Sequence, residues 1–402
     1  MIRYFTIAFL MTCCFAVSGQ LPLEAGRWHA DIALNDSTNL PFILIVSKDG
    51  LSIENAEELV KLTDVRVNED SVSAFFPLYD AEVRLLSLGT LAVGEYINHG
   101  KTSNNVFYMR ALKEPAFRFS ESPKDPKTDI SGKWKLVFDG EEGVNRQNVA
   151  VFRQSGSQVT GSVLTPTGDH RYLDGELSGD RLRLSTFNGA FAFLYDARLQ
   201  ADGSLKGTFY SGHTGFDTWS AYKDPSAELP DANSLVFIKP GADRFDFSFP
   251  DTSGRRWTIN EPELRNRVRI VQIMGTWCPN CLDESKFLND YYLKNRMKGV
   301  EVIAIDFERS NDTTKAWKNI RRISQQLQIG YPIVFGGISN RDSAAAALPM
   351  LSKVFAYPTT IILDRKGNVR KIHTGFSGPA TGEAFEAYRA EFEAFIGELL
   401  GD

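Results

Sequence analysis

The chain has 402 residues, of which 43% are hydrophobic and 24% are charged. This balance excludes a disordered protein, and the length predicts two or three domains. A formal net charge of −5 without a long basic run argues against a nucleic-acid partner, and four cysteines are too few for a scaffold held by disulfides.

Residues 1–19 have the features of an export signal. Arg3 gives a positive start, residues 4–17 are almost all apolar, and Val17-Ser18-Gly19 supplies small residues before a cut near Gln20. A buried strand or a membrane anchor is the alternative, but the run is shorter than the about 20 residues of a spanning helix. We therefore expect an exported protein, periplasmic or associated with the cell envelope, that has no spanning segment.

Two of the four cysteines, Cys13 and Cys14, lie inside this signal. Cleavage after Gly19 removes both and leaves Cys278 and Cys281 as the only thiols, so no other thiol competes with that pair. Lipid attachment is a less favoured alternative, because Leu10-Met11-Thr12-Cys13 lacks the small residue that precedes the cysteine of a bacterial lipoprotein site.

Residues 20–122 and 128–224 are predicted to be two copies of one β domain. The two copies are separated along the chain by far more than the length of a solenoid repeat, so we interpret them as a tandem duplication of one domain. The shared landmarks are a Gly-x-Trp opening (Gly26 to Trp28 and Gly132 to Trp134), a Leu-Tyr-Asp-Ala segment (78–81 and 194–197) and a Gly-containing turn (89–91 and 203–205).

Alternating apolar and polar residues in the second copy indicate short antiparallel strands, which predicts a barrel or a sandwich. The expected strands are 148–152, 158–164, 181–185 and 190–194. The Gly-x-Trp opening resembles that of small lipocalin-like barrels. A Trp that plugs one end of a β core is the favoured interpretation, and a ligand-binding Trp is the alternative.

Proline-containing joints at 123–127 and 223–233 separate these domains from a third, residues 238–402, in which the pattern changes. A βαβαβα order followed by a hairpin and a helix indicates a three-layer α/β domain. We expect strands at 268–274, 300–305, 331–335, 359–363 and 368–373, an earlier hairpin at 245–249 and 256–259, and helices at 281–298, 313–328, 344–355 and 384–400.

The segment Trp277-Cys278-Pro279-Asn280-Cys281 places two thiols three positions apart where a strand gives way to a helix. We expect Cys278 at the N-cap and Pro279 at the first helical position, where its missing N–H costs nothing. The free N–H groups and the positive end of the helix favour a thiolate at Cys278, and the thiolate is the nucleophile. Cys281, one turn later, is placed to attack a disulfide formed on Cys278.

A zinc site and a static disulfide are the alternatives to redox chemistry at this pair. No second Cys or His pair completes a zinc site. A static link between residues three apart constrains the unfolded chain little. We therefore favour redox chemistry and expect no cofactor and no metal.

Four residues near the dithiol are candidates for a structural or a functional role. Glu284 shares a helix face with Cys281 and either complements the helix dipole or exchanges protons with that thiol, whereas Asp283 is expected to be solvated. Trp277 is either a lid over the dithiol or a core residue. Pro358 follows Tyr357; a trans bond is the default, and a cis bond beside the two sulfurs is the functional alternative.

With Gly275-Thr276-Trp277-Cys278-Pro279-Asn280-Cys281, Glu284 and a late Tyr357-Pro358-Thr359-Thr360 together, residues 238–402 resemble the TlpA/ResA type of exported thioredoxin-like oxidoreductase. The resemblance implies a thioredoxin fold, a cis Pro358, Cys278 as attacking thiol, Cys281 as resolving thiol and Glu284 as an active-site acid. It also implies protein disulfides as substrates and an electron donor in the envelope.

Thioredoxin has a buried Asp on the strand before the dithiol, and the matching position here is Gln272, so proton transfer falls to Glu284 or to water. We expect Trp277, Tyr357 and Pro279 to contact the substrate. The resemblance does not cover residues 20–235.

The leading hypothesis is a thiol–disulfide oxidoreductase that reduces protein disulfides. A peroxiredoxin-like peroxidase is a second, weaker one, because that chemistry uses Thr or Ser where Gly275 stands. A third is a binding module, in which the β domains engage a ligand or partner and the dithiol domain is accessory.

Overall fold

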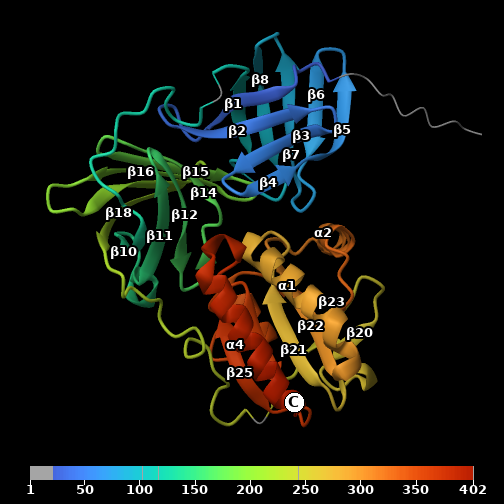
Figure 1. The fold of residues 1–402 in the computed structure, drawn as a ribbon. Coiled ribbons are helices and arrows are strands. Elements are labelled where there is room, and N and C mark those ends of the chain that lie inside the picture. Colours follow the sequence, from blue (N-terminus) through green and yellow to red (C-terminus); the bar gives the residue numbers. More distant parts are fainter. Residues whose placement is uncertain (1–20, 102, 116, 243, 402) are drawn as a thin grey trace, which may run out of the picture.

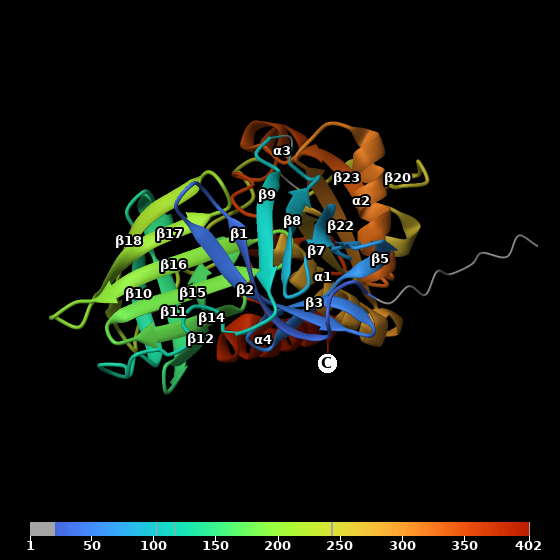
Figure 2. The same ribbon diagram turned by 90° about the horizontal axis from the view of Figure 1, so that it is seen from above.

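The computed structural model describes residues 21–101, 103–115, 117–242 and 244–401. The predicted export signal at 1–19, with Cys13 and Cys14, lies outside these residues. Two β units and one α/β unit pack against one another, and the N-terminal end of the first helix lies where the three units meet (Figures 1 and 2). No helix within the described ranges is long and apolar enough to cross a membrane.

The first unit is a nine-stranded antiparallel sheet that curls until β1 pairs with β9. The ring is incomplete between β4 and β5, which are not neighbours in the sheet order. In β9 every second residue is buried, as expected for a sheet with one face on a core. The strands are β1 (Gly26–Ala33), β2 (Asn39–Ser47), β3 (Gly50–Asn55), β4 (Glu58–Lys61), β5 (Thr63–Asn68), β6 (Ser71–Phe75), β7 (Ala81–Ser87), β8 (Leu91–Asn98) and β9 (Val106–Leu112).

The second unit is also a nine-stranded antiparallel sheet, and pairing of β10 with both β11 and β18 and of β11 with β12 closes it into a ring. Its interior is filled by one apolar cluster that includes Trp134, Tyr195 and Trp219. The strands are β10 (Gly132–Phe138), β11 (Asn148–Ser155), β12 (Gln158–Thr165), β13 (Gly168–Asp169), β14 (Leu173–Ser178), β15 (Arg181–Phe187), β16 (Ala192–Leu199), β17 (Leu205–Ser211) and β18 (Gly215–Lys223), with a short 3-10 helix, η1 (Gly143–Arg146).

The Gly-x-Trp landmark occupies the same place in both units. Trp28 and Trp134 lie on the first strand of each sheet, and each indole N–H donates to the carbonyl four residues earlier, Glu24 and Ile130. Both side chains are buried in the core, as expected for a Trp that plugs one end of a β core.

The two Leu-Tyr-Asp-Ala segments do not occupy equivalent positions in the two units, so the alignment based on them was wrong. Leu78, Tyr79 and Asp80 form the connection that precedes β7, whereas the second copy of the segment lies inside β16. The physical reason is that a short apolar–aromatic–acidic pattern fits a turn as well as a strand.

The third unit is a five-stranded mixed sheet in the order β23-β22-β21-β24-β25. Its central strand β21 (Val268–Met274) is buried at every residue, as predicted for a strand covered on both faces. The other strands are β22 (Val300–Glu308), β23 (Ile333–Ile338), β24 (Thr359–Leu363) and β25 (Val369–Thr374), and a separate pair, β19 (Ser248–Pro250) and β20 (Arg256–Thr258), forms the earlier hairpin.

The helices of this unit are α1 (Pro279–Asn295), α2 (Thr313–Gln326), α3 (Arg341–Ala347) and α4 (Glu383–Leu400), with 3-10 helices η2 (Pro262–Leu264), η3 (Arg296–Lys298) and η4 (Pro379–Thr381). Leu288 of α1, Ile320 of α2 and Ile396 of α4 share one apolar cluster with Ile270 of β21. The small helix α3 contributes Ala344 to a second cluster with Val271. Helices therefore cover both faces of the sheet, as the three-layer prediction requires.

The predicted helix at 344–355 is wrong in extent. The helix α3 starts earlier, where the Asn340 side chain accepts from the Ser343 N–H at 2.8 Å, and it ends at Ala347. Pro349 explains the early end, because proline excludes the helical conformation from the residue before it and has no N–H to donate.

Candidate active site

Cys278 caps helix α1, and Pro279 is its first residue, as predicted. The Cys278 sulfur accepts from the Cys281 backbone N–H at 3.4 Å, so it lies against the first turn of the helix. The strand β21 ends at Met274, and the turn to Cys278 places the sulfur at the carboxyl edge of the sheet. There the sulfur faces the free N–H groups of the first helical turn.

Both cysteines are free thiols, and both are buried. The Cys278 side chain keeps a 5% exposed fraction and Cys281 has none. Burial raises the pKa of Cys281 well above its usual value, and the neighbouring Cys278 adds to the rise. Attack by Cys281 on a disulfide therefore needs a nearby group that removes its proton.

The Tyr357–Pro358 peptide bond is cis, as the resemblance implies. The Tyr357 carbonyl accepts from the Cys278 thiol at 3.3 Å, which places this loop directly beside the dithiol. Pro358 is buried, and the Pro358 carbonyl accepts from the Gly375 N–H at 2.9 Å. The short backbone edge at Tyr357 that an extended substrate would pair with is thus engaged by the enzyme's own thiol.

Glu284 is fully buried inside a small polar network behind the dithiol. It accepts from the Gln272 side chain at 2.9 Å and from the Thr360 hydroxyl at 2.8 Å. Gln272 also donates to the Cys281 carbonyl at 3.1 Å, so one side chain contacts both Cys281 and Glu284. Burial raises the pKa of Glu284 to about 7, although these hydrogen bonds oppose the rise.

Trp277 is half-buried and forms one wall of the site. Its indole N–H donates to the Phe307 carbonyl at 2.9 Å, and its ring meets Tyr357 edge to face with centroids 5.6 Å apart. The guanidinium of Arg309 lies over the same ring, 4.4 Å from its centroid. Burial lowers the pKa of Arg309, and its electrostatic interaction with Cys278 opposes that lowering.

Two buried acids at the end of β22, Asp306 and Glu308, were not predicted from the sequence. Asp306 accepts from the Thr276 N–H at 3.0 Å, and Glu308 accepts from the Thr276 hydroxyl, so both fix the turn that leads to Cys278. Burial raises the pKa of each carboxyl, and for Asp306 the charge of Glu308 adds to the rise. The sequence did contain a signal for them: two acids two positions apart at the carboxyl end of a predicted parallel strand, the edge at which functional sites of α/β sheets lie.

The second β unit also reaches the dithiol, through the segment between β12 and β14. The Asn280 side chain, inside the Cys-Pro-Asn-Cys segment, donates to the Asp169 carbonyl at 3.0 Å. The Asp169 carboxylate accepts from the Gly378 N–H at 2.6 Å. A β-unit loop thus contacts the residue between the two cysteines, which no sequence signal had indicated.

Asp283 was expected to be solvated, but it is half-buried and ion-paired. It pairs with Arg171 of the second unit, and Arg171 also pairs with Glu58 of β4 in the first. Burial raises the pKa of Asp283 to about 7, and the Arg171 guanidinium opposes that rise. This ion triad, Glu58–Arg171–Asp283, joins all three units next to the start of α1.

The third unit, a thioredoxin-like fold with a dithiol at a helix N-terminus, matches a known family. Residues 240–372 match the AhpC/TSA family. The C-terminal part of the chain is homologous to thiol–disulfide oxidoreductases of the ResA type.

Among the curated relatives, thiol-disulfide oxidoreductase ResA of Geobacillus thermodenitrificans is 27% identical over 138 residues, 34% of this chain and 71% of the relative. ResA of Bacillus cereus is 25% identical and covers 44% of this chain and 87% of the relative. The thioredoxin-like protein YneN of Bacillus subtilis is 26% identical, with coverage of 41% and 83%. A solved structure titled a putative thiol:disulfide interchange protein DsbE, from Chlorobium tepidum, is 23% identical and covers 40% of this chain and all of its own, with a TM-score of 0.30.

Proposed function

We propose that this protein is an exported thiol–disulfide oxidoreductase that reduces protein disulfides through Cys278 and Cys281. The observation that supports it is that Cys278 caps α1 with Cys281 behind it and Tyr357–Pro358 beside it, in a segment homologous to thiol–disulfide oxidoreductases. The names of these relatives favour neither the peroxidase nor the accessory-domain hypothesis.

In the proposed reaction, the Cys278 thiolate attacks one sulfur of the substrate disulfide, and the other sulfur leaves as a thiolate that takes up a proton. Glu284 in its carboxylate form then accepts the Cys281 proton, and the Cys281 sulfur attacks Cys278. The second substrate sulfur leaves as a thiolate and takes up the proton that Glu284 gives back, so that it is released as a thiol. The substrate gains two electrons and two protons, and the enzyme is left with a Cys278–Cys281 disulfide, which an electron donor of the cell envelope reduces.

Single cysteine variants test the assignment of the two thiols. We expect Cys278→Ser to abolish reduction of insulin by the full chain, and Cys281→Ser to accumulate a mixed disulfide between Cys278 and insulin, detected by intact-mass spectrometry. Insulin reduction at an unchanged rate by Cys278→Ser would refute the proposal. Titration of the dithiol in glutathione buffers gives the potential and hence the direction of electron flow.

The division into domains at 20–122, 128–224 and 238–402 and the signal at 1–19 belong to the same proposal. N-terminal sequencing of the protein recovered from the cell envelope tests the export prediction, and we expect a first residue near Gln20. A full-length N-terminus on cytosolic protein would contradict it.

A further inference from the structure

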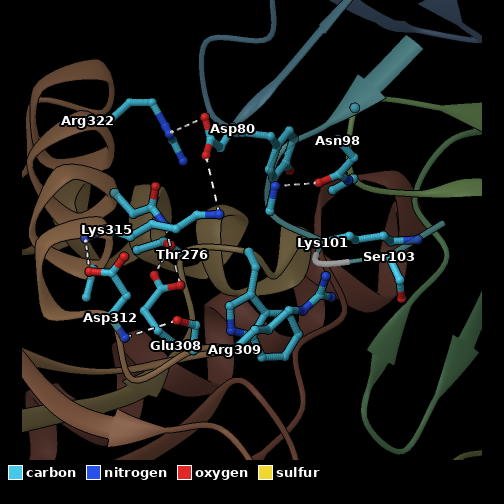
Figure 3. A pocket seen from close by; sticks show the side chains of 18 residues that line it. Asp80, Asn98, Lys101, Ser103, Thr276, Glu308, Arg309, Asp312, Lys315 and Arg322 are labelled. Atoms are coloured by element: carbon cyan, nitrogen blue, oxygen red, sulfur yellow. Dashed lines mark hydrogen bonds and ion pairs between the residues drawn. The ribbon is translucent and has the colours of Figure 1, made fainter. Parts of the chain in front are cut away.

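A cavity of about 650 Å³ lies beside the dithiol, at the meeting point of the three units (Figure 3). Trp277 and Arg309 line it from the α/β unit, Tyr79 and Lys101 from the first β unit, and Ala190 from the second. Its size is that of a small-molecule site, and such sites are common where domains meet.

Four cationic side chains line this cavity, and only two of them have an acidic partner among the described residues. Lys315 and Arg322 both approach the Asp80 carboxylate, each at 3.9 Å. Lys101 and Arg309 have no ion pair with a carboxylate in the part of the chain that the structure describes; their contacts are with the rings of Phe107 and Trp277. The lining thus holds four cationic groups and three carboxyl groups, those of Asp80, Glu308 and Asp312, and two of the four cations have no ion pair to any residue described.

The other two acids that the structure describes at the cavity hold hydrogen bonds of their own and form no ion pair with Lys101 or Arg309. Asp312 uses its carboxylate to cap α2, accepting from the N–H groups of Thr314 and Lys315. Glu308 accepts from the Thr276 hydroxyl and, at 3.4 Å, from the Asn319 amide; burial raises its pKa, and the charges of Arg322 and Arg309 oppose that rise. Burial also lowers the pKa of Lys101, and the nearby charge of Arg309 lowers it further. An anion bound between Lys101 and Arg309 would stabilise the charged form of Lys101 and so oppose this lowering of its pKa.

We propose that this cavity binds a carboxylate of the disulfide substrate, so that the enzyme prefers disulfides with a negative charge close to the reacting sulfur. The inference rests on the proposed function. Arg309 connects the two sites, because its guanidinium lies on the Trp277 ring next to Cys278 in the chain and interacts electrostatically with Cys278. A carboxylate held there would be close to the disulfide bond that Cys278 attacks.

The carboxylate has two sources, a small disulfide or an acidic side chain of a protein segment. In either case the two-electron balance is unchanged: the disulfide is reduced to two thiols, and the Cys278–Cys281 pair is oxidised. The two sources differ only in size: a protein segment must enter between the three units, whereas a small disulfide needs only the cavity.

The experiment compares rates of oxidation of the reduced full-length protein by disulfides of equal size and different charge. The series is 3,3′-dithiodipropionate (anionic), bis(2-hydroxyethyl) disulfide (neutral) and cystamine (cationic), each rate divided by that of free dithiothreitol with the same reagent. We expect the anion to be favoured by about tenfold over the neutral compound, and the preference to fall when salt is raised from about 0.05 to 0.5 M.

Lys101→Gln isolates the cavity from the thiol chemistry, because Lys101 comes from the first β unit. We expect it to lose most of the anion preference while the rate with the neutral disulfide, which also reports correct folding, stays unchanged. Lys127→Gln is the matched control, since Lys127 forms an exposed ion pair with Asp180. A Lys101→Gln protein with the wild-type preference would overturn the inference.

A second arm uses a disulfide-containing peptide with aspartates beside its cysteines and a twin with asparagines. A preference for the aspartate peptide identifies a protein segment as the source, and a preference confined to the small series identifies a small disulfide. Equal normalised rates in both series overturn the inference while the proposed function stands. Failure to oxidise with the neutral disulfide contradicts the proposed function itself.

Discussion

Glu284 shows how burial changes the acidity of one residue behind the dithiol. Its carboxyl group is fully buried, holds hydrogen bonds from Gln272 and Thr360, and has a pKa raised to about 7. Cys281, whose pKa is raised by the same surroundings, lies one helical turn earlier. An acid with a pKa near the working pH is suited to exchange protons with such a thiol.

We expect Glu284→Gln to slow the resolving step about 100-fold, the lower range for loss of a general base, without changing the first attack by Cys278. Wild-type resolution should become faster as pH rises through about 7, where Glu284 turns into a carboxylate, and the variant should lack that step. Rapid-quench mass spectrometry of the mixed disulfide measures both. Glu301→Gln, in β22, is the control.

The same pKa makes Glu284 a source of pH-dependent stability. Its folded pKa of about 7 lies above the ordinary value of 4.5, so the folded state binds the proton more tightly. This contribution is present in full below pH 4.5 and is lost as pH rises to about 7, a decrease of about 3 kcal/mol. Urea unfolding across this range should show a loss of stability that is about 3 kcal/mol smaller in Glu284→Gln than in the wild type, because other buried acids such as Asp283 still titrate in the variant.

At the scale of elements, the segment between β12 and β14 packs closely against the N-terminal end of α1, where the dithiol lies. An added Cβ at Gly168 would lie 2.8 Å from the Asn280 side chain, and one at Gly375 would lie 2.7 Å from the Pro166 carbonyl. Glycine at both places lets two backbones approach closely. The packing of these loops, and not only the helix cap, decides how the dithiol is covered.

Gly375→Ala tests this approach against a matched glycine. Gly375 has φ 81° and Gly203 has φ 80°, but an added Cβ at Gly203 meets nothing within 4 Å. Both variants place Ala in the left-handed region at about 1 kcal/mol, and Gly375→Ala should lose about 2 kcal/mol more through overpacking. Equal urea midpoints for the two would contradict the close contact.

Arg171 is the element-scale link between all three units. Arg171→Gln leaves Asp283 and Glu58 without their cation, and we expect about 3 kcal/mol lower stability and faster alkylation of Cys278 by iodoacetamide. Arg153→Gln is the control, because Arg153 and Glu57 form an exposed pair between the two β units and should contribute below about 0.5 kcal/mol. Similar effects of both variants would show that the triad does not hold the units together.

At the scale of the whole molecule, the β units cover the dithiol. Tyr79 of the first unit shares an apolar cluster with Cys278 and Cys281, and the second unit holds Asn280. Figure 1 shows the N-terminal end of α1 directed toward both β units. We therefore expect a large substrate to reach Cys278 only when the units separate, and a small one to enter through the cavity beside Trp277.

This arrangement predicts a dependence on reagent size. Folded, reduced protein should react with N-ethylmaleimide about tenfold faster, or more, than with a polyethylene glycol maleimide, because opening the units costs at least about 1.4 kcal/mol. The two rates should converge in denaturant and approach each other in Arg171→Gln. Equal rates in the folded wild type would mean that the β units leave the dithiol open.

Local sequence determined the parts of this protein that local energetics decide. The cap at Cys278, the first helical position of Pro279, the start of α2 and the buried strand β21 depend on propensities and periodicity within a few residues, so they were predictable. The end of α3 was predictable too, because Pro349 excludes a longer helix, whereas the apolar residues of 344–355 by themselves indicate one.

The tertiary structure alone decided what surrounds the dithiol. Asp169 and Arg171 lie more than a hundred residues from Asn280 and Asp283, and nothing in either segment specifies the other. The same holds for the cavity that brings Lys101 near Arg309. Contacts of this kind arise from the packing of three folded units, whose relative positions depend on their whole surfaces and not on any short stretch of the chain.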